Sequence, residues 1–148
     1  QPASMRFITS YSLEGGSRGG LRLVELQVVG TERGKRVLLN DFPYGGPRAA
    51  GRLVTGMTQD PRVGEILLTF APIEPSPASF VIADELENCV FSYLIPEGFG
   101  QPARWTPAWT RPTQLPQAVS IQIAARADPA RLGPVTITVP IRATFLSP

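Results

Sequence analysis

Residues 118–124 read Ala-Val-Ser-Ile-Gln-Ile-Ala, and residues 134–145 read Pro-Val-Thr-Ile-Thr-Val-Pro-Ile-Arg-Ala-Thr-Phe. In both stretches apolar side chains recur at every second position, which is the period of a β-strand with one buried face. The residues predicted to point inward are Val119, Ile121, Ile123, Val135, Ile137, Val139 and Ile141. Pro140 has no N–H group, so we expect the second strand, or its second half, to lie at the edge of a sheet.

Residues 86–95 (LENCVFSYLI) have the same two-residue period but carry apolar side chains on both faces. One of these faces holds Cys89, Phe91, Tyr93 and Ile95. A strand that is apolar on both faces is typical of the centre of a sheet covered on both sides. In that position we expect Cys89 to act as a small buried hydrophobic residue rather than as a reactive thiol.

Further runs rich in β-branched and aromatic residues predict more strands. They are residues 5–12, 21–29, 35–40, 64–70 and 79–83. Residues 30–34 hold two Gly and separate two of these runs, which predicts a hairpin with a five-residue loop. Asp84 and Glu85 predict a break before the strand at residues 86–95.

Pro and Gly are abundant, with 16 Pro and 14 Gly among 148 residues, and neither suits a helix interior. We therefore exclude a helical bundle. Turn-forming residues concentrate in the segments 14–20, 41–62, 71–78 and 96–116, which we expect to be loops or extended crossings. The sequence predicts one domain over residues 1–148 that is mostly β, with about seven antiparallel strands in two sheets or a partly open barrel and long Pro/Gly-rich loops.

The residue types needed for common chemistry are scarce. The chain has no His, one Cys and one Lys, which excludes a Ser-His-Asp triad, an intrachain disulfide and a Cys-based zinc site. Asp84, Glu85 and Glu87 match no calcium-binding spacing and are predicted to form a solvated turn. We predict no catalytic, cofactor-binding or metal-binding residue.

Charge is distributed unevenly along the chain. Residues 1–62 carry nine basic and five acidic residues, residues 63–103 carry six acidic and no basic ones, and residues 104–148 carry five basic and one acidic. The basic residues are spread singly, which argues against nucleic-acid binding. A dipolar chain of this kind suits docking against other proteins in one orientation.

Both Trp residues, Trp105 and Trp109, fall in the Pro-rich segment 96–116. Two indoles in an open loop could stack on a sugar ring, so a carbohydrate-binding β-sandwich is one alternative. A loop fixed to the core by its Trp residues is the interpretation we favour.

A more specific pattern runs from residue 86 to residue 123. A strand containing Phe91-x-Tyr93 is followed by the loop with Trp105 and Trp109. Then come Leu115-Pro116-x-Ala118-Val119 and an alternating strand. This order resembles the minor pseudopilins of type II secretion systems, and within them the J-type subunit. Minor pilins of type IV pilus systems share part of the pattern and are a second alternative.

The resemblance implies a head domain in the bacterial periplasm whose family is α+β at full length. It implies an inner-membrane anchor before assembly, through a hydrophobic N-terminal helix that is absent from this chain. The implied partners are the I-type and K-type minor pseudopilins, joined in a complex at the tip of the pseudopilus. The motif residues are then expected to serve packing rather than catalysis.

Overall fold

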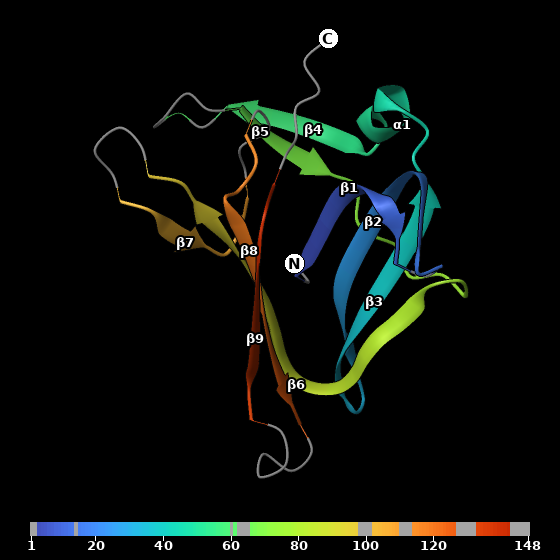
Figure 1. The fold of residues 1–148 in the computed structure, drawn as a ribbon, viewed down its shortest axis with the longest axis vertical. Helices are drawn as coiled ribbons and strands as arrows, with labels where there is room; N and C mark the ends of the chain where they lie inside the picture. The colour runs from blue at the N-terminus through green and yellow to red at the C-terminus, as the bar shows by residue number, and fades with distance from the viewer. Residues whose placement is uncertain are drawn as a thin grey trace.

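A computed structural model describes residues 3–13, 15–59, 61, 66–97, 102–109, 114–126 and 133–142. Within these ranges the chain forms strands and one short helix, shown in Figure 1. They are β1 (Ser4–Ser12), β2 (Ser17–Thr31), β3 (Gly34–Pro43), α1 (Pro47–Gly51), β4 (Val54–Gln59), β5 (Ile66–Phe70), β6 (Phe80–Ile95), β7 (Arg104–Thr106), β8 (Ala118–Ala125) and β9 (Val135–Pro140).

The strands form one large antiparallel sheet and one small one. In the large sheet the order is β1-β2-β3-β6-β8-β9. Strand β7 lies off this order and pairs with the last three residues of β6. The small sheet contains β4 and β5, which lie beyond the ends of β1 to β3 (Figure 1). The expectation of a mostly β, antiparallel fold with two sheets is confirmed. The large sheet is not closed into a barrel, because β1 and β9 are its two free edges.

Strand β6 bends the large sheet back on itself, as the curved ribbon in Figure 1 shows. Its first half pairs with β3 and its second half with β8, and the two sets of pairs meet at Leu86. Glu85 has a φ of 55°, and the registers shift on both sides of it. Such irregularities are β-bulges, which increase the local bend of a strand. The predicted break at Asp84 and Glu85 is therefore wrong, since the chain kinks there without leaving the sheet.

The core lies between the two halves of the bent sheet. The first half contributes Val24, Leu26, Val28, Val37 and Leu39, and the second half contributes Leu86, Cys89, Phe91, Tyr93 and Val119, all buried. Cys89 is 3% exposed, which confirms its predicted role, and burial raises the pKa of its thiol. The position of β6 at the centre of the sheet is also confirmed. Its second face is half-covered, because Val90, Ser92 and Leu94 are partly exposed.

The turn between β2 and β3 is shorter than expected. Thr31 pairs with Gly34, so two residues form the loop instead of the predicted five. Gly34 has a φ of 126°, a conformation that other residues rarely adopt. The chain also pairs earlier than expected, because β2 begins at Ser17, inside the predicted loop 14–20.

The Pro-rich segments are more regular than the sequence suggests. Residues 41–62 were expected to hold no regular element, but they contain the end of β3, helix α1 and strand β4. Short elements of this kind tolerate Pro and Gly because both residues can occupy ends and edges. Residues 71–78 form no helix or strand, in agreement with the predicted turn or extended crossing: residues 77–78 form a turn, and Ile73 is buried.

Candidate functional site

Six of the eight motif residues lie at the packed centre of the second half of the sheet. Phe91, Tyr93, Pro116, Ala118 and Val119 are buried, and Trp109 is half-buried against the core. Tyr93 faces Val119 directly across the β6–β8 ladder. The motif therefore acts as a packing unit that holds the loop before β8 on the sheet.

Trp109 is fixed in place from two sides. Its ring centroid lies 6.5 Å from that of Tyr93, with the two planes tilted by 44°. Its indole Nε1–H donates a 3.0 Å hydrogen bond to the carbonyl oxygen of Gln114. This confirms the expectation that Trp109 fastens its loop to the core.

The remaining two motif residues point to solvent, contrary to expectation. Trp105 is 46% exposed and Leu115 is 56% exposed. The segment around Trp105 is strand β7 rather than a loop, with Trp105 paired to Leu94 of β6. Strand β7 is at an outer edge of the sheet, so few other residues cover the side chain of Trp105. The two indoles have different surroundings, which weakens the idea of a paired sugar-binding platform.

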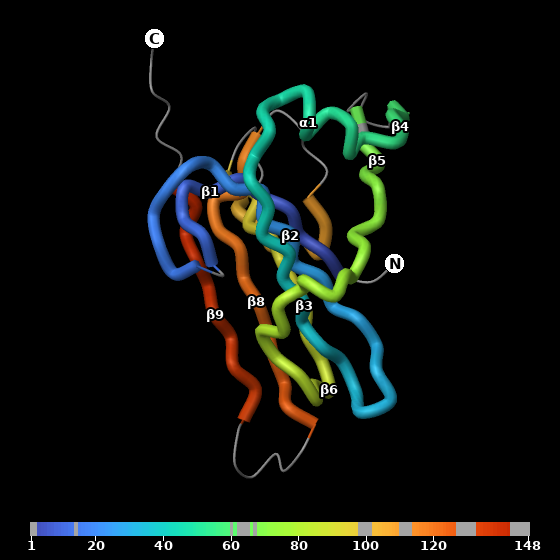
Figure 2. The backbone as a smooth tube through the Cα atoms, turned by 90° about the vertical axis from the view of Figure 1, so that its right-hand side faces the viewer, coloured from blue at the N-terminus to red at the C-terminus, as the bar shows by residue number. Residues whose placement is uncertain are grey.

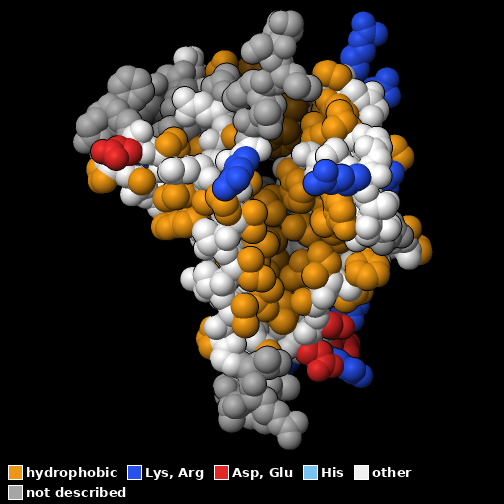
Figure 3. All heavy atoms as spheres, viewed as in Figure 1, with side chains coloured by type: hydrophobic (Ala, Val, Ile, Leu, Met, Phe, Trp, Pro, Cys, Tyr) orange, Lys and Arg blue, Asp and Glu red, His pale blue; other side chains and the backbone are white. Residues whose placement is uncertain are grey.

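The apolar inner face continues beyond the core across β8 to β9. Three rows of directly opposed residues cross these strands: Tyr93–Val119–Val139, Phe91–Ile121–Ile137 and Cys89–Ile123–Val135. The residues on β6 are at most 8% exposed, whereas Val135, Ile137 and Val139 are 48–49% exposed. Figure 3 shows hydrophobic side chains gathered in the middle of this view, over the region between β9 and β1–β2. We call the nine residues of the three rows the open apolar face, because it runs from buried side chains on β6 to half-exposed ones on β9.

The predictions for residues 134–142 are thus half correct, and residues 143–145 of the predicted strand lie outside the described residues. The strand lies at a sheet edge, as Pro140 indicated, and Figure 2 shows β9 at the border of the sheet beside β8. The predicted burial of its apolar side chains is wrong, since Val135, Ile137, Val139 and Ile141 are all at least 38% exposed. Periodicity identifies which face is apolar but cannot tell whether another element covers it.

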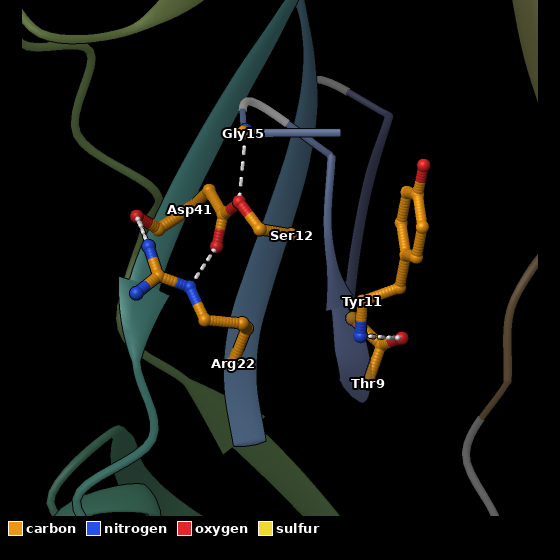
Figure 4. Close-up of polar contacts among 6 residues, drawn as sticks. All are labelled: Thr9, Tyr11, Ser12, Gly15, Arg22 and Asp41. Atoms are coloured by element: carbon orange, nitrogen blue, oxygen red, sulfur yellow. Dashed lines mark hydrogen bonds and ion pairs between the residues drawn. The ribbon is translucent and has the colours of Figure 1, made fainter. Parts of the chain in front are cut away.

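Two buried carboxylates lie on β2 and β3, and their oxygens accept hydrogen bonds from side chains of β1, β2 and β3. Glu25 accepts a 2.6 Å hydrogen bond from Arg6 Nε and a 3.1 Å bond from Asn40 Nδ2. Asp41 accepts bonds from Arg22 Nε at 2.6 Å and from Ser12 Oγ at 2.8 Å (Figure 4). Pairing of this kind is what buried charges require. The two carboxylates therefore serve to hold the strands together, and neither is a candidate for catalysis or ligand binding.

Figure 4 also shows how the β1–β2 turn is held beside this cluster. Ser12 Oγ accepts a 2.9 Å bond from the N–H of Gly15 while it donates to Asp41. Thr9 Oγ1 accepts a 3.1 Å bond from the N–H of Tyr11, at the point where the β1–β2 register shifts. The contacts of Ser12 therefore join the start of this turn to Asp41 of β3.

The acidic group at residues 84–87 belongs to the bulge of β6. It faces the β2–β3 turn through Arg36 with Asp84, Arg33 with Glu85, and Lys35 with Asn88. The hydrogen bond and charge of Arg36 lower the pKa of Asp84. The predicted turn is wrong, because these residues belong to strand β6, but their expected exposure is confirmed, and Asp84 and Glu85 have partners across the strands.

Among the described residues, no group of three or more His, Cys, Asp or Glu side chains could hold a metal ion. In the same ranges, no helix is long and apolar enough to span a bilayer. In comparisons with known proteins, no protein-family model, no curated protein and no solved structure matches this chain. The open apolar face is thus the strongest candidate for a functional surface in the described part of the chain.

Proposed function

We propose that this chain is the head domain of a minor pseudopilin of a type II secretion system, of the J type. In this function it is a structural protein that joins the I-type and K-type minor pseudopilins in a complex at the pseudopilus tip. The observation that carries the proposal is the open apolar face, where one row of residues passes from buried Phe91 to half-exposed Ile137. Adjacent exposed apolar side chains, such as Val135, Ile137 and Val139 on this face, are typical of proteins that assemble.

Two further features support the same function. The motif residues that resemble the family are adjacent on β6 and β8, with Tyr93 against Trp109 and Val119. The hydrophobic helix that the resemblance implies would have a matching surface, because the open apolar face accepts apolar side chains. Such a head would be located in the periplasm and held in the inner membrane by that helix before assembly.

The coding sequence upstream of residue 1 provides the first test. We expect it to encode a short leader ending in Gly, then an aromatic residue or Met, a Glu four residues further on and about 20 apolar residues. A natural start codon directly before residue 1, with no such segment, would refute the proposal.

Co-purification provides the second test. Heads of the I-type and K-type minor pseudopilins from the same genome are co-expressed with tagged residues 1–148, and we expect a complex to elute together. The matched control uses minor pilin heads of the type IV pilus system, which should stay unbound. Retention of the type IV heads in place of the I-type and K-type heads would move the chain to the type IV pilus system. Binding of neither set would contradict both assignments.

Carbohydrate binding is a second candidate, and the exposed indole of Trp105 is the observation that favours it. Because Trp109 is held by Tyr93 and Gln114, Trp105 would have to act alone. Glycan-array binding that is lost in Trp105→Ala but kept in Leu115→Ala would support this function. If the wild-type chain binds no glycan on the array, carbohydrate binding is excluded as a function.

A further inference from the structure

Strand β9, together with Pro134 just before it, has a sequence that reads the same in both directions. Residues 134–140 read Pro-Val-Thr-Ile-Thr-Val-Pro, with Ile137 at the centre. Side chains alternate across a strand, so Val135, Ile137 and Val139 share the apolar face while Thr136 and Thr138 share the other. Two such strands placed antiparallel about Ile137 would match each residue with one of the same type.

The main-chain N–H and C=O groups of every second residue in β9 are directed away from β8, as pairing with another strand requires. The N–H of Ile141 donates a 2.9 Å hydrogen bond to the carbonyl of Gln117, just before β8. Main-chain groups alternate sides along a strand, so those of Val135, Ile137 and Val139 face β8. Those of Thr136 and Thr138 therefore point away from the sheet, where no strand of the described chain pairs with them.

We propose that this free edge pairs with β9 of a second copy of the chain, about a two-fold axis at Ile137. Thr136 then lies opposite the partner's Thr138, and each such pair exchanges two N–H···O=C bonds. Val135 lies opposite the partner's Val139, and Ile137 opposite the partner's Ile137. Pro134 and Pro140 have no N–H to donate, so the pairing ends at them on both sides.

Charge supports a second copy as the occupant. A two-fold axis brings each group near its own equivalent, so a charged strand would repel itself. Residues 134–140 carry no charge at all. The other free edge is β1. The carbonyl of Ala3 accepts a hydrogen bond from the N–H of Val28, so the main-chain groups of odd-numbered residues in β1 face β2. Those of Arg6 therefore point outward, and this edge carries a charged residue. Its sequence is not the same in both directions, so β9 is the edge suited to self-pairing.

The pairing would also extend the open apolar face across the axis. Val135, Ile137 and Val139 are 48–49% exposed and would be covered on their free side by the same residues of the partner. A pair of five-residue strands is smaller than a standard interface, so we expect a weak dimer with a Kd of about 10–100 µM. This inference is independent of the proposed function.

Sedimentation velocity over about 5–500 µM protein tests the proposal, since it brackets the expected Kd. We expect the wild-type chain to shift from monomer to dimer. Ile137→Lys and Ile137→Glu should each raise Kd at least about tenfold, because like charges then meet at the axis. An equimolar mixture of the two variants should form a heterodimer, since opposite charges meet only if residue 137 faces itself.

Ile8→Lys is the matched control, because Ile8 is 47% exposed on the other free edge and Ile137 is 48% exposed. It should leave dimerisation unchanged. Thermal melts of all variants check that the fold is kept. A wild-type chain that stays monomeric overturns the proposal, as does a dimer that persists in both Ile137 variants or is lost only in Ile8→Lys. None of these results would affect the tip-complex proposal.

A covalent test applies if the charged variants fail to fold. Opposed residues at non-hydrogen-bonded positions of an antiparallel pair have Cα atoms about 4.5 Å apart, within the range that a disulfide spans. Ile137→Cys in a Cys89→Ala background should form a disulfide-linked dimer under mild oxidation, with each thiol losing one hydrogen to the added oxidant. Ile8→Cys in the same background should not. Equal cross-linking of the two would overturn the pairing.

Discussion

The indole of Trp109 lies against the phenol ring of Tyr93, with centroids 6.5 Å apart and planes tilted by 44°. Removing the indole should leave a gap over the core and remove the hydrogen bond that Trp109 donates to the carbonyl of Gln114. We expect Trp109→Ala to lower the free energy of unfolding by about 2–3 kcal/mol, measured by urea denaturation. Trp105→Ala is the control and should change it by less than about 0.5 kcal/mol, since Trp105 is 46% exposed. Equal losses would show that Trp109 is not an anchor.

Both the backbone conformation and the close neighbours at position 34 require a glycine there. Its φ is 126°, and a Cβ at this position would lie 2.6 Å from the carbonyl oxygen of Leu86. We expect Gly34→Ala to cost about 2–3 kcal/mol in urea denaturation, because the strand β6 would have to shift. Gly30→Ala, four residues earlier, has nothing within 4 Å of the added atom and should cost nothing. A tolerated Gly34→Ala would mean that the β2–β3 turn can rearrange.

Arg6 keeps the buried Glu25 carboxylate paired. The two form a 2.6 Å ion pair with side chains 16% and 8% exposed. Arg6→Met keeps most of the packing and removes the charge, and we expect a loss of about 3 kcal/mol in unfolding free energy. The exposed pair of Arg33 and Glu85 supplies the comparison, because Arg33→Met should cost less than about 0.5 kcal/mol. If Arg6→Met were as mild, the carboxylate would have another source of compensation.

Cys89 should make stability depend on pH in the alkaline range. Burial raises the pKa of its thiol above the ordinary 9.0, so the folded state holds the proton more tightly than the unfolded state. The stabilisation is therefore complete below pH 9 and is lost as the pH rises above it. We expect the unfolding free energy to fall more steeply above pH 9 in the wild type than in Cys89→Ala, which cannot ionise. Parallel curves would show that the thiol is accessible to water.

Much of the fold could be predicted from alternation. The strands around Val119 and Phe91 have a clean two-residue period, and both strands lie where expected. Alternation failed at Glu85, where bulges add residues without ending the strand, and at the short elements within residues 41–62. In these places local composition resembles a loop, while pairing with distant strands decides the conformation.

The candidate site was predicted less completely. Tyr93 and Trp109 were correctly placed at the core, because large aromatic residues near an apolar strand usually pack on it. The exposure of Val135, Ile137 and Val139 could not be foreseen, since it depends on which element lies beyond β9. The symmetry of residues 134–140 is visible in the sequence, but it gains meaning only once β9 is known to be a free edge.

The bulges of β6 determine how this strand would respond to changes in length. Its inward-facing residues are Ala83, Leu86, Cys89, Phe91 and Tyr93, so the spacing is three, three, two and two. Deleting one residue at 84–85 or 87–88 would move every later side chain to the opposite face of the sheet. Asp84, Glu85, Glu87 and Asn88 are all exposed, and substitutions there should be mild. Insertions and deletions at the same surface positions should abolish folding, so tolerance to substitution here does not imply tolerance to a change in length.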